Sequence, residues 1–189
     1  MTSTLNPSPR IGSRPPTPGP FGETPPKPAP RVLDPAHLPD HMDLLYRAAC
    51  ALCGSRYDAE DLVQETFVNI LKRPRLLRDD NEIGYLLRAL RNTHANRYRA
   101  AARRPATREL FEDDAPCGDE TDVNARQIMQ AIASAPLHYR DAVIAVDVVG
   151  LSYREAASAL RTRQATITTR LYRGRQHVAR QLLSENATA

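Results

Sequence analysis

The chain has 189 residues, a formal net charge of +4 at pH 7, 16 prolines and three cysteines. No stretch approaches the roughly 18 apolar residues that a membrane span requires, and three cysteines set no disulfide framework of the kind found in small secreted domains. The length allows one domain or two small ones, and we expect a soluble protein of the cytoplasm.

The first 39 residues contain 12 of the 16 prolines and little periodic apolar pattern. Proline fixes φ and lacks the amide donor that a helix or a sheet ladder needs, so a proline-rich run builds neither. We therefore expect residues 1–39 to form an extended, disordered tail.

Helices are predicted from about Asp40 to Arg108, where apolar residues recur at steps of three and four. Within this segment Asp58 is a good N-cap for a helix that Pro74 stops. A long basic helix should follow from about Glu82 to Arg104. Because no strand pattern occurs, the expected fold class is all-α.

Cys50 and Cys53 form a Cys-x-x-Cys pair inside the first of these helices. A zinc site needs about four ligands, and only His37, His41 and Cys117 are candidates to complete one. None of these three stands at an obvious ligand spacing. The pattern favours small buried thiols over a metal site, and neither a metal nor a cofactor is expected.

Charge is segregated along the chain. From Ile83 to Arg108 there are seven arginines and no acid, and from Glu109 to Asp122 there are seven acids and no base. Solvated helix faces normally mix the two signs, whereas such blocks are typical of two nucleic-acid-binding modules joined by an acidic linker. The expected modules are residues 40–106 and 124–184, with the linker at residues 107–123.

The C-terminal part has the pattern of a helix-turn-helix. Gly150 suits the left-handed residue after a helix end, and Ser152 with Glu155 forms a capping box for the next helix. A short turn and a further basic helix should follow, with six arginines and no acid between Arg161 and Arg180. The second helix of such a motif enters the DNA major groove, so this segment is a predicted DNA-binding element.

Several segments resemble the extracytoplasmic-function (ECF) group of bacterial RNA polymerase sigma factors. Residues 58–67 (DAEDLVQETF) resemble the family's most recognisable segment, and residues 86–97 resemble its promoter-melting helix. Residues 147–157 and 166–171 resemble the second sigma domain and its recognition helix. The likeness covers residues 40–183. It implies two small helical domains, a sigma region-two-like bundle and a C-terminal helix-turn-helix, joined by a flexible acidic linker.

The resemblance implies that the helix at residues 58–67 docks on the clamp coiled coil of the largest subunit of core RNA polymerase. By the three-and-four rule, one face of this helix carries the residues expected to bind core polymerase: Asp61, Gln64, Glu65 and Val68. A merely solvated face is the alternative. The expected partners are core polymerase (the clamp of the largest subunit and the second-largest subunit) and promoter DNA, with an anti-sigma factor as a further candidate.

The basic helix is expected to bind the −10 promoter element. Arginines would neutralise phosphates, asparagines could bond to bases, and an aromatic ring could stack on a flipped base. The expected residues are Tyr85, Arg88, Arg91, Asn92, Asn96, Arg97 and Arg99. Tyr98 is a second candidate for stacking, and a place in the core is the alternative for both tyrosines. The family commonly has tryptophan where Tyr85 stands and an acid where Asn96 stands.

The last helix is expected to read the −35 element as duplex, through arginine–guanine pairs and threonine methyl contacts. The expected residues are Arg163, Gln164, Thr166, Thr169, Arg170 and Arg173. Family members often have glycine where Arg161 and Ala165 stand, which indicates a remodelled turn.

The expected function is that of a sigma factor without catalysis of its own. The acidic linker either mimics the charge of RNA in the polymerase channel or is a solvated tether. One alternative is a helix-turn-helix regulator that acts without polymerase, which leaves residues 58–67 unused. Another is a zinc- or redox-responsive anti-sigma-type protein built around Cys50 and Cys53, but Tyr46 stands where zinc-binding members place a histidine.

Overall fold

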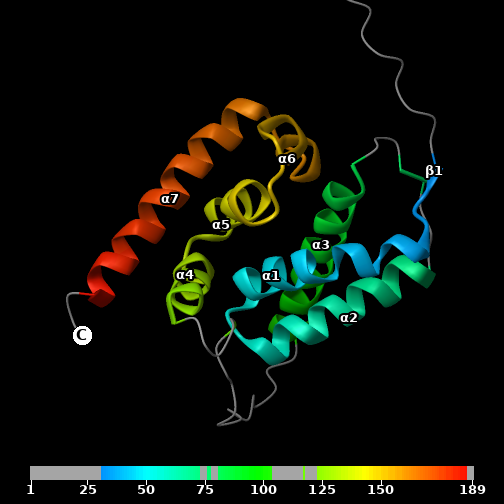
Figure 1. Cartoon of the computed structure of the whole chain (residues 1–189), viewed down its shortest axis with the longest axis horizontal. Helices are drawn as coiled ribbons and strands as arrows, with labels where there is room; N and C mark the ends of the chain where they lie inside the picture. The colour runs from blue at the N-terminus through cyan, green and yellow to red at the C-terminus, as the bar shows by residue number, and fades with distance from the viewer. Residues whose placement is uncertain (1–30, 73–75, 78–80, 104–116, 118–122, 187–189) are drawn as a thin grey trace, which may run out of the picture.

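The structure is a computed structural model that describes residues 31–72, 76–77, 81–103, 117 and 123–186 (Figure 1). In chain order the helices are α1 (Met42–Cys53), α2 (Arg56–Lys72), α3 (Glu82–Arg103), α4 (Val123–Ala133), α5 (Leu137–Val143), α6 (Tyr153–Ala159) and α7 (Gln164–Asn186). A π-helical turn, η3 (Ile144–Val148), continues α5. Figure 1 shows α1–α3 packed together on one side of the molecule and α4–α7 on the other, here called the first and second halves. The predicted all-α class is confirmed.

A short pair of strands precedes these helices. β1 (Arg31–Val32) pairs antiparallel with β2 (Leu76–Leu77), and two 3-10 turns, η1 (Pro35–His37) and η2 (Pro39–His41), lead into α1. The expectation of a disordered tail without strands is therefore wrong for residues 31–39. Residues 1–30 lie outside the described part of the chain.

Buried side chains and a local cap explain why order begins before residue 40. Leu33 and Leu38 are buried and belong to the hydrophobic core. The Ala36 amide donates to Oδ1 of Asp34 over 2.9 Å, which caps η1. Pro35 occupies the first turn, where a missing amide donor costs nothing.

Glu82, the first residue of α3, contacts three basic side chains from the segment that precedes α1. Its carboxylate lies 2.6 Å from Nη1 of Arg31, 3.2 Å from Nε2 of His41 and 3.4 Å from Nδ1 of His37. Burial alone would raise the pKa of Glu82, but the hydrogen bonds from the two histidines and the nearby Arg31 charge lower it. The two histidines considered as zinc ligands therefore face a carboxylate of α3.

Two residues, Gly54 and Ser55, connect α1 to α2. α1 ends at Gly54, whose φ of +78° is the left-handed conformation that glycine adopts without strain. α2 then begins at Arg56, and the Asp58 amide donates to Oγ of Ser55 over 3.4 Å. The capping side chain is thus Ser55 and not Asp58, because the tight turn starts the helix three residues earlier than predicted.

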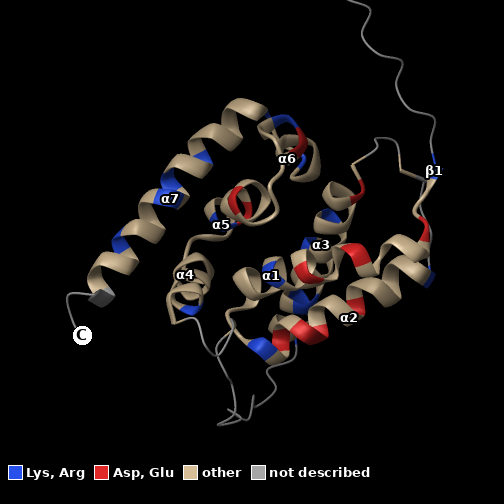
Figure 2. Cartoon of the chain, in the orientation of Figure 1, with Lys and Arg blue, Asp and Glu red and all other residues tan. Residues whose placement is uncertain are grey.

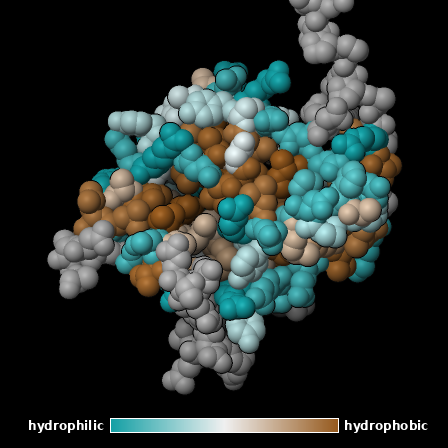
Figure 3. All heavy atoms as spheres, in the orientation of Figure 1, coloured by the Kyte–Doolittle hydropathy of each residue, from teal (hydrophilic) through white to brown (hydrophobic). Residues whose placement is uncertain are grey.

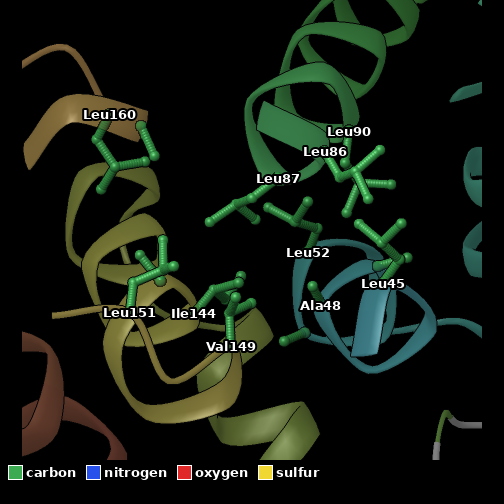
Figure 4. Packing of buried hydrophobic residues seen from close by; sticks show 14 of the residues in the cluster. Leu45, Ala48, Leu52, Leu86, Leu87, Leu90, Ile144, Val149, Leu151 and Leu160 are labelled. Carbon is green, nitrogen blue, oxygen red and sulfur yellow. The ribbon is translucent and has the colours of Figure 1, made fainter. Parts of the chain in front are cut away.

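One continuous hydrophobic core joins the two halves. Figure 4 shows Leu52 of α1 and Leu87 of α3 pointing toward Ile144 of η3, with Leu151 and then Leu160 farther into the second half. All five are buried. Burying such leucine and isoleucine side chains contributes about 1.5–3 kcal/mol each relative to exposure, so this contact holds the halves firmly together.

A disulfide joins Cys50 of α1 to Cys117, with the Cα atoms 5.3 Å apart. Both residues are almost completely buried. The expectation of simple buried thiols is therefore wrong for Cys50, because the chain brings a residue 67 positions away against α1. Apart from Cys117 and Val123, the predicted linker lies outside the described residues.

Within the described residues, no helix has the length and apolar character needed to cross a membrane. Among the same residues, no group of three or more His, Cys, Asp and Glu side chains is placed to hold a metal ion.

Candidate functional site

One exposed face of α2 carries the residues expected to bind polymerase. Asp61, Gln64 and Val68 are exposed and Glu65 is partly exposed, while the residues buried on the other side of the helix are Ala59, Leu62, Val63, Thr66 and Ile70. The helical periodicity thus places all four on one accessible surface, here called the α2 stripe (Asp61, Gln64, Glu65 and Val68).

Arg97 of α3 reaches the edge of the α2 stripe. Its Nε lies 2.5 Å from Oε2 of Glu65, and its Nη2 lies 3.9 Å from Oδ2 of Asp61. These groups are partly exposed, so solvent screening leaves the pairs little effect on stability. Arg97, which was expected to bind DNA, lies at the border between α3 and the α2 stripe.

The outer surface of α3 presents three polar residues at steps of four and three. Asn92, Asn96 and Arg99 are exposed, and they form the α3 polar face. Nη2 of Arg99 donates to Oδ1 of Asn96 over 2.9 Å. Tyr98 beside them is 74% exposed, whereas Tyr85 packs partly buried against the core. Of the two candidate tyrosines, Tyr98 is therefore the accessible one.

Arg88, a further residue expected at the −10 element, is bound by the second half. Its Nη2 donates to the carbonyl oxygen of Ser158 over 2.5 Å, and its Nε donates to that of Ala159 over 3.2 Å. These carbonyls belong to the last turn of α6, where a helix has unsatisfied acceptors and a negative partial charge. In this structure the Arg88 guanidinium serves the contact between the halves.

Arg91 is held in the same way. It donates a charge-assisted hydrogen bond to the carboxylate of Asp141 on α5. Asp141 is only 4% exposed, so this pair lies largely out of water. The residues expected at the −10 element are therefore divided: the α3 polar face is accessible, while Arg88 and Arg91 are engaged by the second half.

A third arginine also connects the halves, but it belongs to the second half and binds the first. Nη1 of Arg140 on α5 donates to the Leu52 carbonyl oxygen at the end of α1 over 2.8 Å, and its Nε and Nη2 donate to the Ala135 carbonyl oxygen. Burial lowers the pKa of Arg140, and the nearby Asp141 partly offsets this. No sequence pattern indicated this role, because each acceptor is a main-chain carbonyl.

The helix-turn-helix forms at the predicted place. The Glu155 amide donates to Oγ of Ser152 over 3.3 Å, and the Ser152 amide donates to Oε2 of Glu155 over 2.9 Å, which is the predicted capping box. The Ser152 hydroxyl also donates to Oε2 of Glu155 over 2.6 Å, and this bond together with that from the Ser152 amide lowers the pKa of Glu155. Gly150 has a φ of +80°, and Arg161 adopts a left-handed φ of +51° in the turn between α6 and α7. The turn thus keeps a conformation that suits glycine although arginine occupies it.

The N-terminal part of α7 presents the residues expected at the −35 element. Ile167 and Leu171 are buried and fix the helix against the second half. The accessible residues are Arg163, Gln164, Thr169 and Arg173, and those partly buried are Thr166 and Arg170. The structure brings all six together around the start of one helix.

Two arginines of α7 are oriented by the second half itself. Nη1 of Arg173 donates to the Tyr139 hydroxyl over 3.0 Å. Arg175 binds the carboxylate of Asp147 through two hydrogen bonds of 2.6 and 3.0 Å, which raise the pKa of Arg175. The sequence does not indicate that Asp147 binds Arg175, although Asp147 lies in the motif that resembles the second sigma domain.

Charge on the surface follows these elements. Figure 2 shows acidic residues along α2 and basic residues along α7, which carries no acid before its last turn. Figure 3 shows apolar surface over α4, α5 and the adjoining part of α7, where Val123, Ile128, Leu137 and Leu183 are exposed. The molecule therefore offers an acidic face, a basic helix and an apolar area as separate surfaces.

Two family models match this chain. The model for sigma-70 region 2 matches residues 39–104, and the model for sigma-70, region 4 matches residues 125–178. Together they cover more than half of the chain. The first match spans α1–α3 with the α2 stripe, and the second spans α4–α6 and most of α7.

Two relatives are similar to this chain over about three quarters of its length. The ECF RNA polymerase sigma factor SigE of Mycolicibacterium smegmatis is 32% identical over 148 residues, which is 73% of this chain and 57% of that protein. This chain therefore spans little more than half the length of that relative. The ECF RNA polymerase sigma factor SigM of Mycobacterium tuberculosis is 29% identical over 145 residues, covering 75% of this chain and 73% of SigM.

A solved structure shares the fold. The sigma factor RpoE in complex with the anti-sigma factor NepR, from Bartonella quintana, aligns with a TM-score of 0.61 and 21% identity. The alignment covers 76% of this chain and 94% of that one. At this level of identity the likeness concerns the arrangement of helices.

Proposed function

This chain belongs to the extracytoplasmic-function group of the sigma-70 family, and we propose that it acts as a sigma factor that binds core RNA polymerase and directs it to promoters. It recognises −10 and −35 elements and assists strand opening by binding alone, without catalysis of its own. The observation that carries the proposal is the presence of both sigma-70 regions in order, each with an accessible polar surface. Such a protein works in the cytoplasm, where polymerase and promoters meet.

The α2 stripe is the proposed contact with core polymerase. Its carboxylates and its amide suit a basic partner surface, and Val68 adds an exposed apolar contact beside them. The partner is the clamp of the largest subunit, and the second-largest subunit is the further contact. Because the stripe remains accessible while the halves are packed together, it is available for docking before any rearrangement.

The α3 polar face and Tyr98 are proposed to meet the −10 element. Amide groups can bond to base edges, and an exposed ring can stack on a base of a separated strand. Arg88 and Arg91 would join them once the second half moves away, adding phosphate contacts and salt dependence. The start of α7 would enter the major groove of the −35 element.

An anti-sigma factor is a further proposed partner. The related RpoE is bound by NepR in its solved structure. The exposed apolar residues Val123, Ile128 and Leu137 of α4 and α5 give such a protein a surface to cover.

The proposal is tested by transcription of fragmented genomic DNA with core polymerase, with and without this protein, followed by mapping of RNA 5′ ends. New start sites that share −10 and −35 elements are the expected result. Absence of new starts, together with failure to co-purify with core polymerase, would identify a helix-turn-helix regulator that acts without polymerase.

Two pairs of variants separate the surfaces. Asp61→Ala should weaken binding to core polymerase, whereas Asp43→Ala removes an exposed acid from α1 and should not. Arg170→Ala should weaken promoter-directed initiation while core binding is kept, and Arg180→Ala makes the same charge change farther along α7. Equal losses within either pair would contradict the assignment of that surface.

A further inference from the structure

We propose that Cys50 and Cys117 form a reversible redox site, and that its oxidation ties the two halves together and so opposes the simultaneous binding of −10 and −35 elements. This inference rests on the proposed sigma-factor function. It adds a covalent modification site to that function and assigns oxidants as the chemical class that acts on it.

The position of the disulfide makes it a tether between the halves. Cys50 lies in α1 of the first half, and Cys117 precedes α4 of the second half by a few residues. Five residues separate Cys117 from Val123, the start of α4, whereas nineteen separate Arg103, the end of α3, from Val123. The bond therefore replaces a long connection between the halves with a short one.

Covalent geometry sets the reach of each form. A fully extended chain spans at most about 3.3–3.6 Å per residue, so the short connection reaches about 20 Å and the long one about 70 Å. The longest helix of each half sets the length of that half: α3 has 22 residues and α7 has 23, which at 1.5 Å per residue gives about 33 and about 35 Å. With both halves aligned along these helices, the oxidised chain spans about 90 Å and the reduced chain about 140 Å.

The distance between the two promoter elements lies close to the shorter of these limits. The −10 and −35 elements are about 25 base pairs apart, or about 85 Å along B-form DNA at 3.4 Å per base pair. The reduced chain spans this distance with about 55 Å to spare, whereas the oxidised chain reaches it only if the tether and both long helices lie fully extended in one line. The true limit of the oxidised form is shorter still, because Cys50 is buried within the first half and the tether must first reach its surface.

The contacts between the halves show what the tethered form does to α3. With the disulfide in place, Arg88 donates to carbonyls of α6, and Arg91 is paired with the buried Asp141. Shortening the connection raises the effective concentration of one half near the other and so favours these contacts. Oxidation thus withdraws two arginines from the −10 surface as well as limiting reach.

The chemistry is a two-electron exchange of thiols for a disulfide. One thiolate attacks hydrogen peroxide to give a sulfenic acid and hydroxide, and the second thiolate displaces hydroxide from that sulfur to form the S–S bond. The two protons that the thiols released convert both hydroxides to water, so that two thiols and one peroxide give one disulfide and two waters. A dithiol reductant reverses the reaction through a mixed disulfide and leaves both cysteines as thiols. Because glutathione and thioredoxin keep cytosolic thiols reduced, a disulfide there is usually transient or redox-sensing.

The test compares peroxide-treated and dithiol-treated full-length protein, with the oxidant removed before core polymerase is added. Alkylation and mass spectrometry establish the state of each cysteine. At a promoter mapped as described above, the oxidised protein should direct at least tenfold less transcription than the reduced one, and dithiol treatment should restore it. Both forms should still bind core polymerase, because the α2 stripe is exposed in the tied form.

Three cysteine variants make the result specific. Cys50→Ser and Cys117→Ser should stay active after peroxide, whereas Cys53→Ser should behave as the wild type, since Cys53 takes no part in the bond. Equal transcription by reduced protein and by protein with a verified Cys50–Cys117 disulfide would overturn the inference but keep the proposed function. Failure of the reduced protein to direct transcription would contradict the proposed function, and the inference with it.

Discussion

Arg91 on α3 forms an ion pair with Asp141 on α5, a residue fifty positions further along the chain. Asp141 is buried, and neither its Oδ1 nor the Nε of Arg91 has a hydrogen-bond partner within the described residues. A buried charge without its partner is expensive, so each residue depends on the other being in place. The pair therefore couples the packing of the second half to the state of a helix assigned to DNA binding.

Arg91→Met should destabilise the protein by roughly 3 kcal/mol, because it leaves the Asp141 carboxylate buried and unpaired. The double variant Arg91→Met with Asp141→Leu should regain most of this loss, since no buried charge remains. Denaturant unfolding of the four proteins of this cycle measures the coupling. Arg99→Met, an exposed substitution on the same helix, is the matched control and should change stability by less than about 0.5 kcal/mol. If Arg91→Met and Arg99→Met lowered the free energy of unfolding equally, the Arg91–Asp141 pair would not hold the two halves together.

Local patterns in the sequence predicted the elements that depend on neighbours in the chain. The capping box of Ser152 and Glu155, the left-handed Gly150 and the α2 stripe all follow from spacings of two to seven residues. The Cys50–Cys117 bond and the Arg91–Asp141 pair join residues 67 and 50 positions apart, and no periodicity encodes such distances. For the same reason the sequence predicts one DNA-binding role for all the arginines of α3. It does not separate Arg88 and Arg91, which the second half binds, from the exposed Arg99.

The N-terminal tail also shows that local sequence patterns do not predict tertiary contacts. Twelve prolines among the first 39 residues predict no regular structure, and that interpretation is local. Order over residues 31–39 depends on burial of Leu33 and Leu38 and on the contacts of Arg31, His37 and His41 with Glu82. These are tertiary interactions, and only the folded chain reveals them.

Gly174→Ala should destabilise the second half by about 1–3 kcal/mol, although alanine normally stabilises a helix interior relative to glycine. A Cβ at this position would lie 2.5 Å from Cγ2 of Val143 and 3.1 Å from the carbonyl oxygen of Tyr139, so α5 and α7 would have to separate. Thermal unfolding measures the loss. Adding Val143→Ala removes the closer contact and should make the additional cost of Gly174→Ala smaller. A gain in stability from Gly174→Ala alone would mean that the two helices lie farther apart than described.

Arg161→Gly should stabilise the protein by about 0.5–1 kcal/mol. Arg161 holds a φ of +51°, which strains a residue with a side chain and suits glycine. Ala165→Gly, at the other position where relatives often have glycine, should destabilise instead, because Ala165 lies in the first turn of α7. Unfolding free energies of the two variants are expected to have opposite signs. Loss of stability at both positions would argue against the left-handed turn.

His94 should make stability depend on pH just below neutrality. Burial lowers its pKa from the ordinary 6.5, the positive charges of Arg140 and Arg97 lower it further, and Asp141 and Asp58 partly oppose them. The unfolded chain therefore binds a proton at a pH where the folded chain keeps the imidazole neutral, so stability falls as pH drops below about 6.5. The loss continues until the lowered folded pKa is reached.

His94→Gln removes this proton uptake, so the variant should lose less stability than the wild type between about pH 7 and pH 5.5. Unfolding free energies measured in denaturant at several pH values across this window give the two slopes. Above pH 7.5 the imidazole is neutral in both states, and any difference there reports only the altered packing. If the wild type and the variant had the same slope below pH 6.5, His94 would titrate as it does in the unfolded chain. Its packing among α3 and α5 charges would then have no effect on folding.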